Sequence, residues 1–253
     1  MQISVLSDWV IAVLLLTLRL APMFAVAPPF TLLNVPVRVR VLVPLMLAAC
    51  MVREVDGIGP MATDLGSLAA IASTELLIGL GFAFALQASF AALSFAGRVL
   101  DVQAGFGLAT VLDPGTRAQS PLIGSVLVLV AAAAFFSADG HHDLLRLIDA
   151  SLRAVPVGAI GAGWPVERVI AHAGLIFSLG LATAATGVLV LFLVDIALGF
   201  MARTLPQMNI LMIGLQVKSI VLILTLVLIS GAAAPALLRI SASALRFMGA
   251  LEP

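Results

Sequence analysis

Residues 76–97 read LLIGLGFAFALQASFAALSFAG, a stretch that contains no Asp, Glu, Lys or Arg. A helix rises about 1.5 Å per residue, so about 20 apolar residues cross the roughly 30 Å of hydrocarbon in a bilayer. Residues 118–138, 169–194 and 219–238 are also free of charge and of similar length. These windows predict an all-α, polytopic membrane protein.

The composition agrees with a membrane location. Hydrophobic residues make up 62% of the 253 positions and charged residues 10%, whereas soluble domains have about 45–50% and 25%. Lys and Arg number 13, as do Asp and Glu, so the net charge does not favour nucleic acid as a partner. The single cysteine, Cys50, excludes an internal disulfide and a thiolate metal cluster. No basic residue precedes the first apolar stretch, so we expect that stretch to be retained and not cleaved as a signal peptide.

The apolar segments follow one another along the whole chain without a polar linker between soluble domains. We therefore expect residues 1–253 to form a single membrane-embedded unit. The first two segments are the weakest, because arginines and prolines interrupt them. The approximate segments are 5–30, 37–52, 66–97, 118–138, 166–200 and 208–238.

Two features argue against six simple crossings. If six spans alternate, arginines fall on both sides of the membrane in similar numbers, so the charge bias that normally sets orientation is missing. In addition, residues 166–200 would form a helix of about 50 Å at 1.5 Å per residue, well beyond the hydrocarbon thickness. We expect this segment either to break, at Gly180 or Gly187, or to protrude.

Several polar side chains lie within or beside the apolar segments. A charged group at the bilayer centre costs about 2.5–3.5 kcal/mol on insertion scales, so these groups should face protein, water or one another. They can form a polar lining or a proton relay, or they can simply pair across helices or with partner subunits. The set that we expect to be buried or at a subunit contact is Arg19, Glu75, Gln103, Asp195, Asn209 and Lys218.

Small residues recur every four positions in two segments, which is one way to bring helices close together in a membrane. The two rows are Ala88, Ala92 and Ala96, and Ser178, Ala182 and Thr186.

Motifs for chemistry are scarce. Residues 139–143, DGHHD, contain typical metal ligands, but neighbouring histidines on a helix point in different directions, and only His172 offers a distant third ligand. A turn at Asp139-Gly140 followed by an interfacial helix fits the pattern better, because the leucines and isoleucine of residues 144–152 have helical spacing. No nucleophile, phosphate-loop or zinc motif is recognisable. We expect no metal, no cofactor and no enzymatic activity.

Residues 105–121, GFGLATVLDPGTRAQSP, cannot form a lipid-facing helix, since they combine glycines, prolines and a turn sequence. They form either a plain connection between two spans or an irregular segment enclosed by protein, where such backbone is tolerated at membrane depth.

Five motifs follow one another along the chain: VPVRVRV (35–41), ELLIGLGFAFAL (75–86), GFGLATVLDP (105–114), DGHHDLLRLIDASLRAVPVG (139–158) and LPQMNILMIGLQVK (205–218). In this order they resemble the FliR family of flagellar export-apparatus membrane proteins, which is related to the SctT component of injectisome type III secretion. Asp101 resembles the residue of the injectisome branch at this position, and Ala104 and Gln216 replace residues that are usual in flagellar members.

The resemblance implies a subunit of the flagellar type III protein export gate, in the bacterial cytoplasmic (inner) membrane at the flagellar basal body. It implies helical hairpins packed in a hetero-oligomeric spiral with FliP and FliQ, contacts with FlhB and lipid, and passage of unfolded export substrates. Alternatives are an injectisome export-gate subunit, or a small secondary transporter that uses its intramembrane charges.

In this family the segment that corresponds to residues 105–121 helps to plug the channel. The resemblance therefore implies a plug made by Gly105, Phe106, Gly107, Leu108, Val111, Leu112, Asp113, Pro114 and Gly115.

Overall fold

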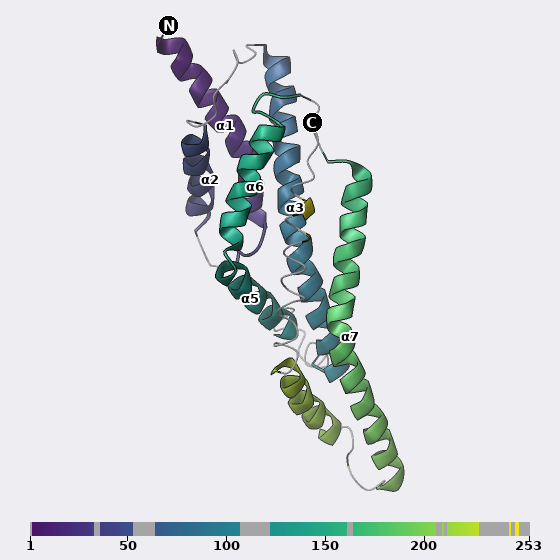
Figure 1. Ribbon diagram of the computed structural model, residues 1–253. Coiled ribbons are helices and arrows are strands. Elements are labelled where there is room, and N and C mark those ends of the chain that lie inside the picture. The colour runs from purple at the N-terminus through teal and green to yellow at the C-terminus, as the bar shows by residue number, and fades with distance from the viewer. Residues whose placement is uncertain are drawn as a thin grey trace. The chain divides into compact units, whose positions relative to one another are not determined.

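The structure, a computed structural model, describes residues 2–32, 36–52, 64–106, 122–160, 164–205, 209, 212–227, 243 and 246–247. Every regular element in these ranges is a helix (Figure 1), which confirms the all-α prediction for this part of the chain. The helices are α1 (Gln2–Val26), α2 (Val37–Met51), α3 (Leu65–Ala104), α5 (Leu122–Ser137), α6 (Gly140–Ala154), α7 (Val166–Thr204) and a last helix, Met212–Val227.

The chain divides into two compact units, each built from separate parts of the sequence. Helices α3, α5 and α7 contribute to both units. Unit 1 comprises Met1–Ser89, Phe135–Ala173 and Ser241–Pro253, and unit 2 comprises Phe90–Ala134 and Gly174–Ile240. A single membrane-embedded unit for the whole chain stays a prediction.

In unit 1 the core lies among α1, α2, α6 and the first part of α3 (Figure 1). α6 has the predicted helical register, because Leu144, Ile148 and Leu152 are all buried on one face. α1 continues through Pro22, although a proline was expected to interrupt this segment. α2 likewise continues through Pro44, which is buried.

In unit 2 glycines on α7 meet α3. A Cβ at Gly180 would lie 2.9 Å from the carbonyl oxygen of Ala92, and a Cβ at Gly187 would lie 2.6 Å from the side chain of Leu100. α7 is continuous through both glycines, so of the two alternatives for this segment the break is wrong. Because glycine has no side chain, these two positions let the backbones of α7 and α3 come close together.

The two predicted rows of small residues have different outcomes. On α3, Ala92 and Ala96 are buried. On α7, the predicted row of Ser178, Ala182 and Thr186 is exposed, so its assignment as a packing face within this chain is wrong. The face that packs is instead marked by Ile176, Gly180, Ala184, Gly187 and Leu191, which are buried.

Three helices in the described ranges are long and apolar enough to cross a membrane. These candidate spans are Asp8–Val26, Leu65–Ala104 and Val166–Thr204, and the pair α5 and α6, bent by 70°, would add a fourth if it acts as one span. The apolar window of Val166–Thr204 is only 22% buried within the chain. Its remaining surface must be covered by lipid or by other proteins.

Candidate functional site

Arg19 and Glu75 form a fully buried ion pair in unit 1. Nε of Arg19 donates to Oε2 of Glu75 at 2.6 Å, and Nη2 donates to Oε1 at 3.0 Å. Nη2 also donates to the carbonyl oxygen of Val155 at 3.0 Å, and Nη1 lies 3.3 Å from both the carbonyl oxygen and Oγ of Ser151. A guanidinium has five N–H groups, and these contacts can use all of them. The pair therefore joins α1, α3 and α6 without leaving an unsatisfied donor on Arg19.

A close approach of α1 to α3 places this pair. A Cβ at Gly79 would run into the carbonyl group of Arg19, so only glycine lets the two backbones come this close. Gly79 follows Glu75 by four residues and lies on the same face of α3. In the sequence ELLIG, Glu75 is thus the acidic partner, and Gly79 allows the close helix contact that places Arg19 beside it. Sequence reasoning singled out Arg19 and Glu75, but Ser151 and Val155 carried no recognisable signal.

A second polar cluster, in unit 2, consists of Gln103, Asp195 and Lys218, from α3, α7 and the helix Met212–Val227. Nζ of Lys218 lies 2.5 Å from Oδ1 of Asp195. Nε2 of Gln103 donates to Oδ2 of Asp195 at 3.2 Å, and Nζ of Lys218 donates to the carbonyl oxygen of Gln103 at 3.3 Å. That carbonyl belongs to the last turn of α3, where a cation stabilises the negative end of the helix dipole.

This cluster is partly open to its surroundings. The side chain of Lys218 is 19% exposed and that of Asp195 is 36% exposed. Together with Gln103 they line a cavity of about 520 Å³, whose other walls come from the ends of α3 and α7 and from Gly214 and Leu215. A charged group at the wall of an open cavity can meet water or a passing chain, which a sealed pair cannot.

Gly105 ends α3 beside this cavity. Its φ of +89° is in the left-handed region, and the N–H groups of Gly105 and Phe106 donate to the carbonyls of Val102 and Asp101 at 3.1 and 3.0 Å. This is the Schellman arrangement that glycine favours at a helix C-terminus. The side chain of Leu215 fills the space that a Cβ would take. The chain therefore leaves α3 at a defined point.

The other residues expected at a plug or at a subunit contact are placed as follows. Phe106 is half-buried. Asn209 is exposed, and its Oδ1 accepts a hydrogen bond from the backbone N–H of Met212 at 3.4 Å, at the start of the last helix. That helix continues through the exposed Gln216. The predicted plug residues Gly107, Leu108, Val111, Leu112, Asp113, Pro114 and Gly115 lie outside the described residues.

Asp101 has a role that the sequence did not reveal. Both of its carboxylate oxygens lie 3.2 Å from the backbone N–H of Ile123 and accept from it, so Asp101 caps the N-terminus of α5 across a separation of 22 residues. A carboxylate at a helix N-terminus satisfies a free donor and interacts favourably with the helix dipole. One turn earlier, a Cβ at Gly97 would collide with the backbone of Gly124. α3 and α5 therefore meet backbone to backbone at this point.

The histidines of the DGHHD motif lie in the first turn of α6, where His142 is exposed and His141 is half-buried. Ligand atoms of Asp139, His141 and His142 all lie within 4.8 Å of one another, so these three could hold a metal ion. Nδ1 of His142 is 3.3 Å from Oδ1 of Asp139, a contact that an exposed surface pair makes without metal. His172 is not part of that group, because its buried ring packs against Phe84 and stacks on Phe247.

A sequence model of the family described as bacterial export proteins, family 1, matches residues 10–244. The chain belongs to this family. It is 33% identical to flagellar biosynthetic protein FliR of Bacillus subtilis strain 168, over 82% of this chain and 81% of that protein. It is 27% identical to FliR of Escherichia coli K12, over 78% and 76% of the two chains. Yop proteins translocation protein T of Yersinia pestis is also 27% identical, over 65% and 64%.

Membership confirms the resemblance that the five motifs indicated. The chain is a membrane protein of the type III export family, a transport component. The family match includes both charged pairs and Gly105. Gln103, Asp195, Lys218 and Gly105 are therefore the best candidates in the described residues for a role in transport, since they line an open cavity.

Proposed function

We propose that the chain is a structural subunit of the flagellar type III protein export gate. It contributes part of a channel wall through which unfolded export substrates pass, in the bacterial cytoplasmic membrane at the flagellar basal body. The observation that carries the proposal is the family match over residues 10–244. In this proposal the energy for transport comes from other parts of the apparatus, and this chain supplies part of the wall and the closure.

The exposed surface supports a role within an assembly. Large apolar side chains on α7, such as Phe177, Leu189 and Phe200, are 57%, 59% and 67% exposed in the isolated chain. Chains of the FliP, FliQ and FlhB type are the partners that we expect to cover such surfaces. In this proposal the helices pack as tilted hairpins in a hetero-oligomeric spiral, which would also explain why α7 is longer than a bilayer is thick.

Residues 105–121 are the proposed plug. The fixed end of α3 at Gly105 supports this assignment, because the segment then departs from a defined point beside the open cavity that Asp195 and Lys218 line. Phe106, Leu108, Val111 and Leu112 would seal the channel by apolar contacts that exclude water and ions, and Asp113-Pro114-Gly115 would turn the chain back.

The plug is tested by deleting residues 106–112 and measuring ion conductance across membranes that contain the assembled complex. We expect assembly to persist and ion leakage to rise. A matched variant replaces the same residues by glycine and serine without changing the length, which separates loss of the apolar seal from shortening. Unchanged conductance in an assembled complex would reject the plug.

The second candidate is an export-gate subunit of an injectisome, because the Yersinia pestis protein matches 65% of the chain. The flagellar assignment is favoured by the higher identity and coverage of the Bacillus subtilis protein. Deleting the gene from its host separates the two, since loss of motility supports the flagellar role and retained motility with loss of effector secretion supports the injectisome role.

A small secondary transporter was the alternative from another class. It would use Arg19, Glu75, Asp195 and Lys218 as an ion or substrate site. The contacts argue against the Arg19–Glu75 half of such a site, because Arg19 closes fully on Glu75 and its helical neighbours and leaves nothing for a solute to bind.

A further inference from the structure

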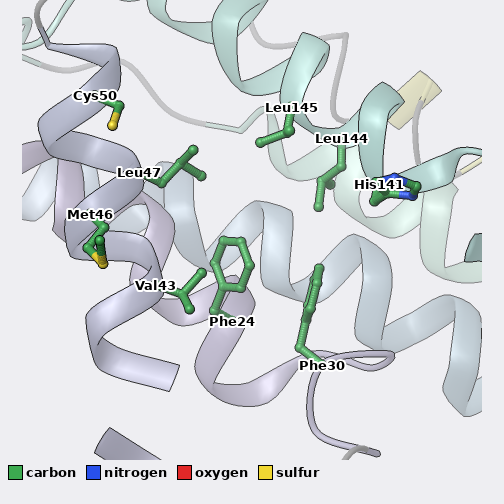
Figure 2. A pocket seen from close by; sticks show the side chains of 9 residues that line it. All are labelled: Phe24, Phe30, Val43, Met46, Leu47, Cys50, His141, Leu144 and Leu145. Atoms are coloured by element: carbon green, nitrogen blue, oxygen red, sulfur yellow. The ribbon is translucent and has the colours of Figure 1, made fainter. Parts of the chain in front are cut away.

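An apolar cleft of about 450 Å³ opens in unit 1 beside α2. Figure 2 shows side chains of α1, α2, α6 and the turn after α1 around it, with Phe24 and Phe30 between those of α2 and those of α6. The rim is open, since Val43, Met46 and Leu145 are 41%, 68% and 37% exposed. Its volume is within the range of sites for small organic ligands.

The cleft lies where a candidate span ends. The span Asp8–Val26 has Phe24 in its last turn, and Phe24 lines the cleft together with Phe30 from the turn that follows. The end of a membrane-spanning helix is the depth at which lipid hydrocarbon gives way to headgroups. An apolar cleft at this depth is therefore within reach of an acyl chain.

An arginine near the start of α2 lies on the same face of this helix as the residues that line the cleft. Arg40 precedes Val43 and Leu47 by three and seven positions, so it lies one turn beyond the cleft on the face that lines it. Arg40 is half-buried, and Arg38, two positions earlier, is exposed. α2 contains no acidic residue, and Pro36 at its N-cap makes no side-chain cap. Residues two positions apart on a helix point to different sides, so an anion at this end of the cleft would be stabilised by the guanidinium group of Arg40 and by the helix N-terminus.

The opposite wall comes from α6, where His141, Leu144 and Leu145 line the cleft. Nδ1 of His141 is buried, so the surface that this wall presents to the cleft is apolar and suits hydrocarbon. The cleft thus combines a hydrocarbon-sized apolar volume with an anion site at one end.

We propose that this cleft binds an anionic phospholipid, with one acyl chain between α2 and α6 and the phosphate at Arg40 and the N-terminus of α2. The lipid would fill an apolar volume that unit 1 leaves open and would hold α2 against α1 and α6. The proposal needs only that the protein lies in a membrane, so it stands or falls independently of the plug.

Cys50 provides the probe, because it is the only cysteine of the chain, is exposed and lines the cleft. The full chain, with the subunits that co-purify, is labelled with bimane and placed in phosphatidylcholine nanodiscs. Either phosphatidylglycerol or phosphatidylcholine with brominated acyl chains is then added in steps. A Cys50→Ser preparation treated in the same way carries label only on other subunits, and its signal is subtracted.

We expect brominated phosphatidylglycerol to quench the label at about a fivefold lower mole fraction than brominated phosphatidylcholine, as one arginine that contributes about 1 kcal/mol beside an anionic headgroup would give. The double variant R38Q/R40Q should lose this preference while both lipids still quench. The matched variant R146Q, which removes an exposed arginine of α6, should keep the preference.

Two results would overturn the proposal. Equal quenching by the two lipids in the unchanged protein would show that no anionic headgroup is selected. Absence of quenching by either lipid would show that another protein segment fills the cleft. Both results come from the unchanged chain, so the test remains decisive even if R38Q/R40Q fails to assemble.

Discussion

Arg19 with Glu75 and Asp195 with Lys218 are both oppositely charged pairs carried by apolar helices, but only the first is sealed. The Arg19–Glu75 pair is 0% exposed and has every guanidinium donor in reach of an acceptor. The Asp195–Lys218 pair is 36% and 19% exposed and lines a cavity. A sealed pair can only hold helices together, whereas an open pair can also interact with what enters the cavity.

The largest effect is expected from Arg19→Met. The substitution leaves the Glu75 carboxylate buried without its partner, which costs about 3–5 kcal/mol. The amount of folded protein in the membrane should fall sharply, and the purified complex should melt at a lower temperature. The double variant R19M/E75L should recover much of the loss, because both charges are then gone. If Arg19→Met alone is as stable as the unchanged protein, the Arg19–Glu75 pair is not needed to hold α1, α3 and α6 together.

A somewhat smaller loss is expected from Gly79→Ala. The new Cβ would meet the carbonyl group of Arg19 and push α1 away from α3, and overpacking of this kind costs about 1–3 kcal/mol. Gly174→Ala is the matched control, since nothing lies within 4 Å of its Cβ position. Thermal unfolding of the two purified variants in detergent measures the difference. Equal melting temperatures would mean that the close approach at Gly79 is unnecessary.

Lys218→Met should affect transport more than stability. A partly exposed pair contributes roughly 0–1 kcal/mol, so the amount of assembled protein should hardly change. Under the proposed function, however, an altered cavity wall should reduce swarming motility. The double variant D195N/K218Q, which removes both charges, shows whether the loss comes from an unpaired Asp195 or from the missing polar lining. Normal motility in both variants would show that Gln103, Asp195 and Lys218 are not part of the channel wall.

The smallest effect is expected at the surface of α6. Arg153 lies 2.8 Å from Asp149 one turn away, with side chains 81% and 51% exposed. Exposed pairs at this spacing contribute about 0.3–0.5 kcal/mol, so Arg153→Ala should leave both the melting temperature and motility nearly unchanged. A loss comparable to that of Arg19→Met would indicate that Arg153 contacts another subunit.

Helix positions were largely predictable, because length without charge and helical spacing are local properties. The register of Leu144, Ile148 and Leu152 on α6 follows from the sequence alone. The local sequence of a helix does not show which other helix it packs against. For this reason Gly180 and Gly187 could be taken as breaks in α7, although they allow its close contact with α3.

The sites were predictable only in part. The cost of an isolated charge in an apolar segment singled out Arg19, Glu75, Asp195 and Lys218. It could not tell a sealed pair from an open one, since burial depends on residues that are distant in sequence, such as Ser151 and Val155. Asp101 was missed for the same reason, because its acceptor role depends on the start of α5.

Under the proposed function this chain acts within a hetero-oligomeric gate. Purification from the native host in a mild detergent, followed by mass measurement of the intact particle, tests it most directly. We predict a particle that contains this chain together with several copies of two smaller membrane proteins. A stable monomer or homodimer without other membrane subunits would contradict the account.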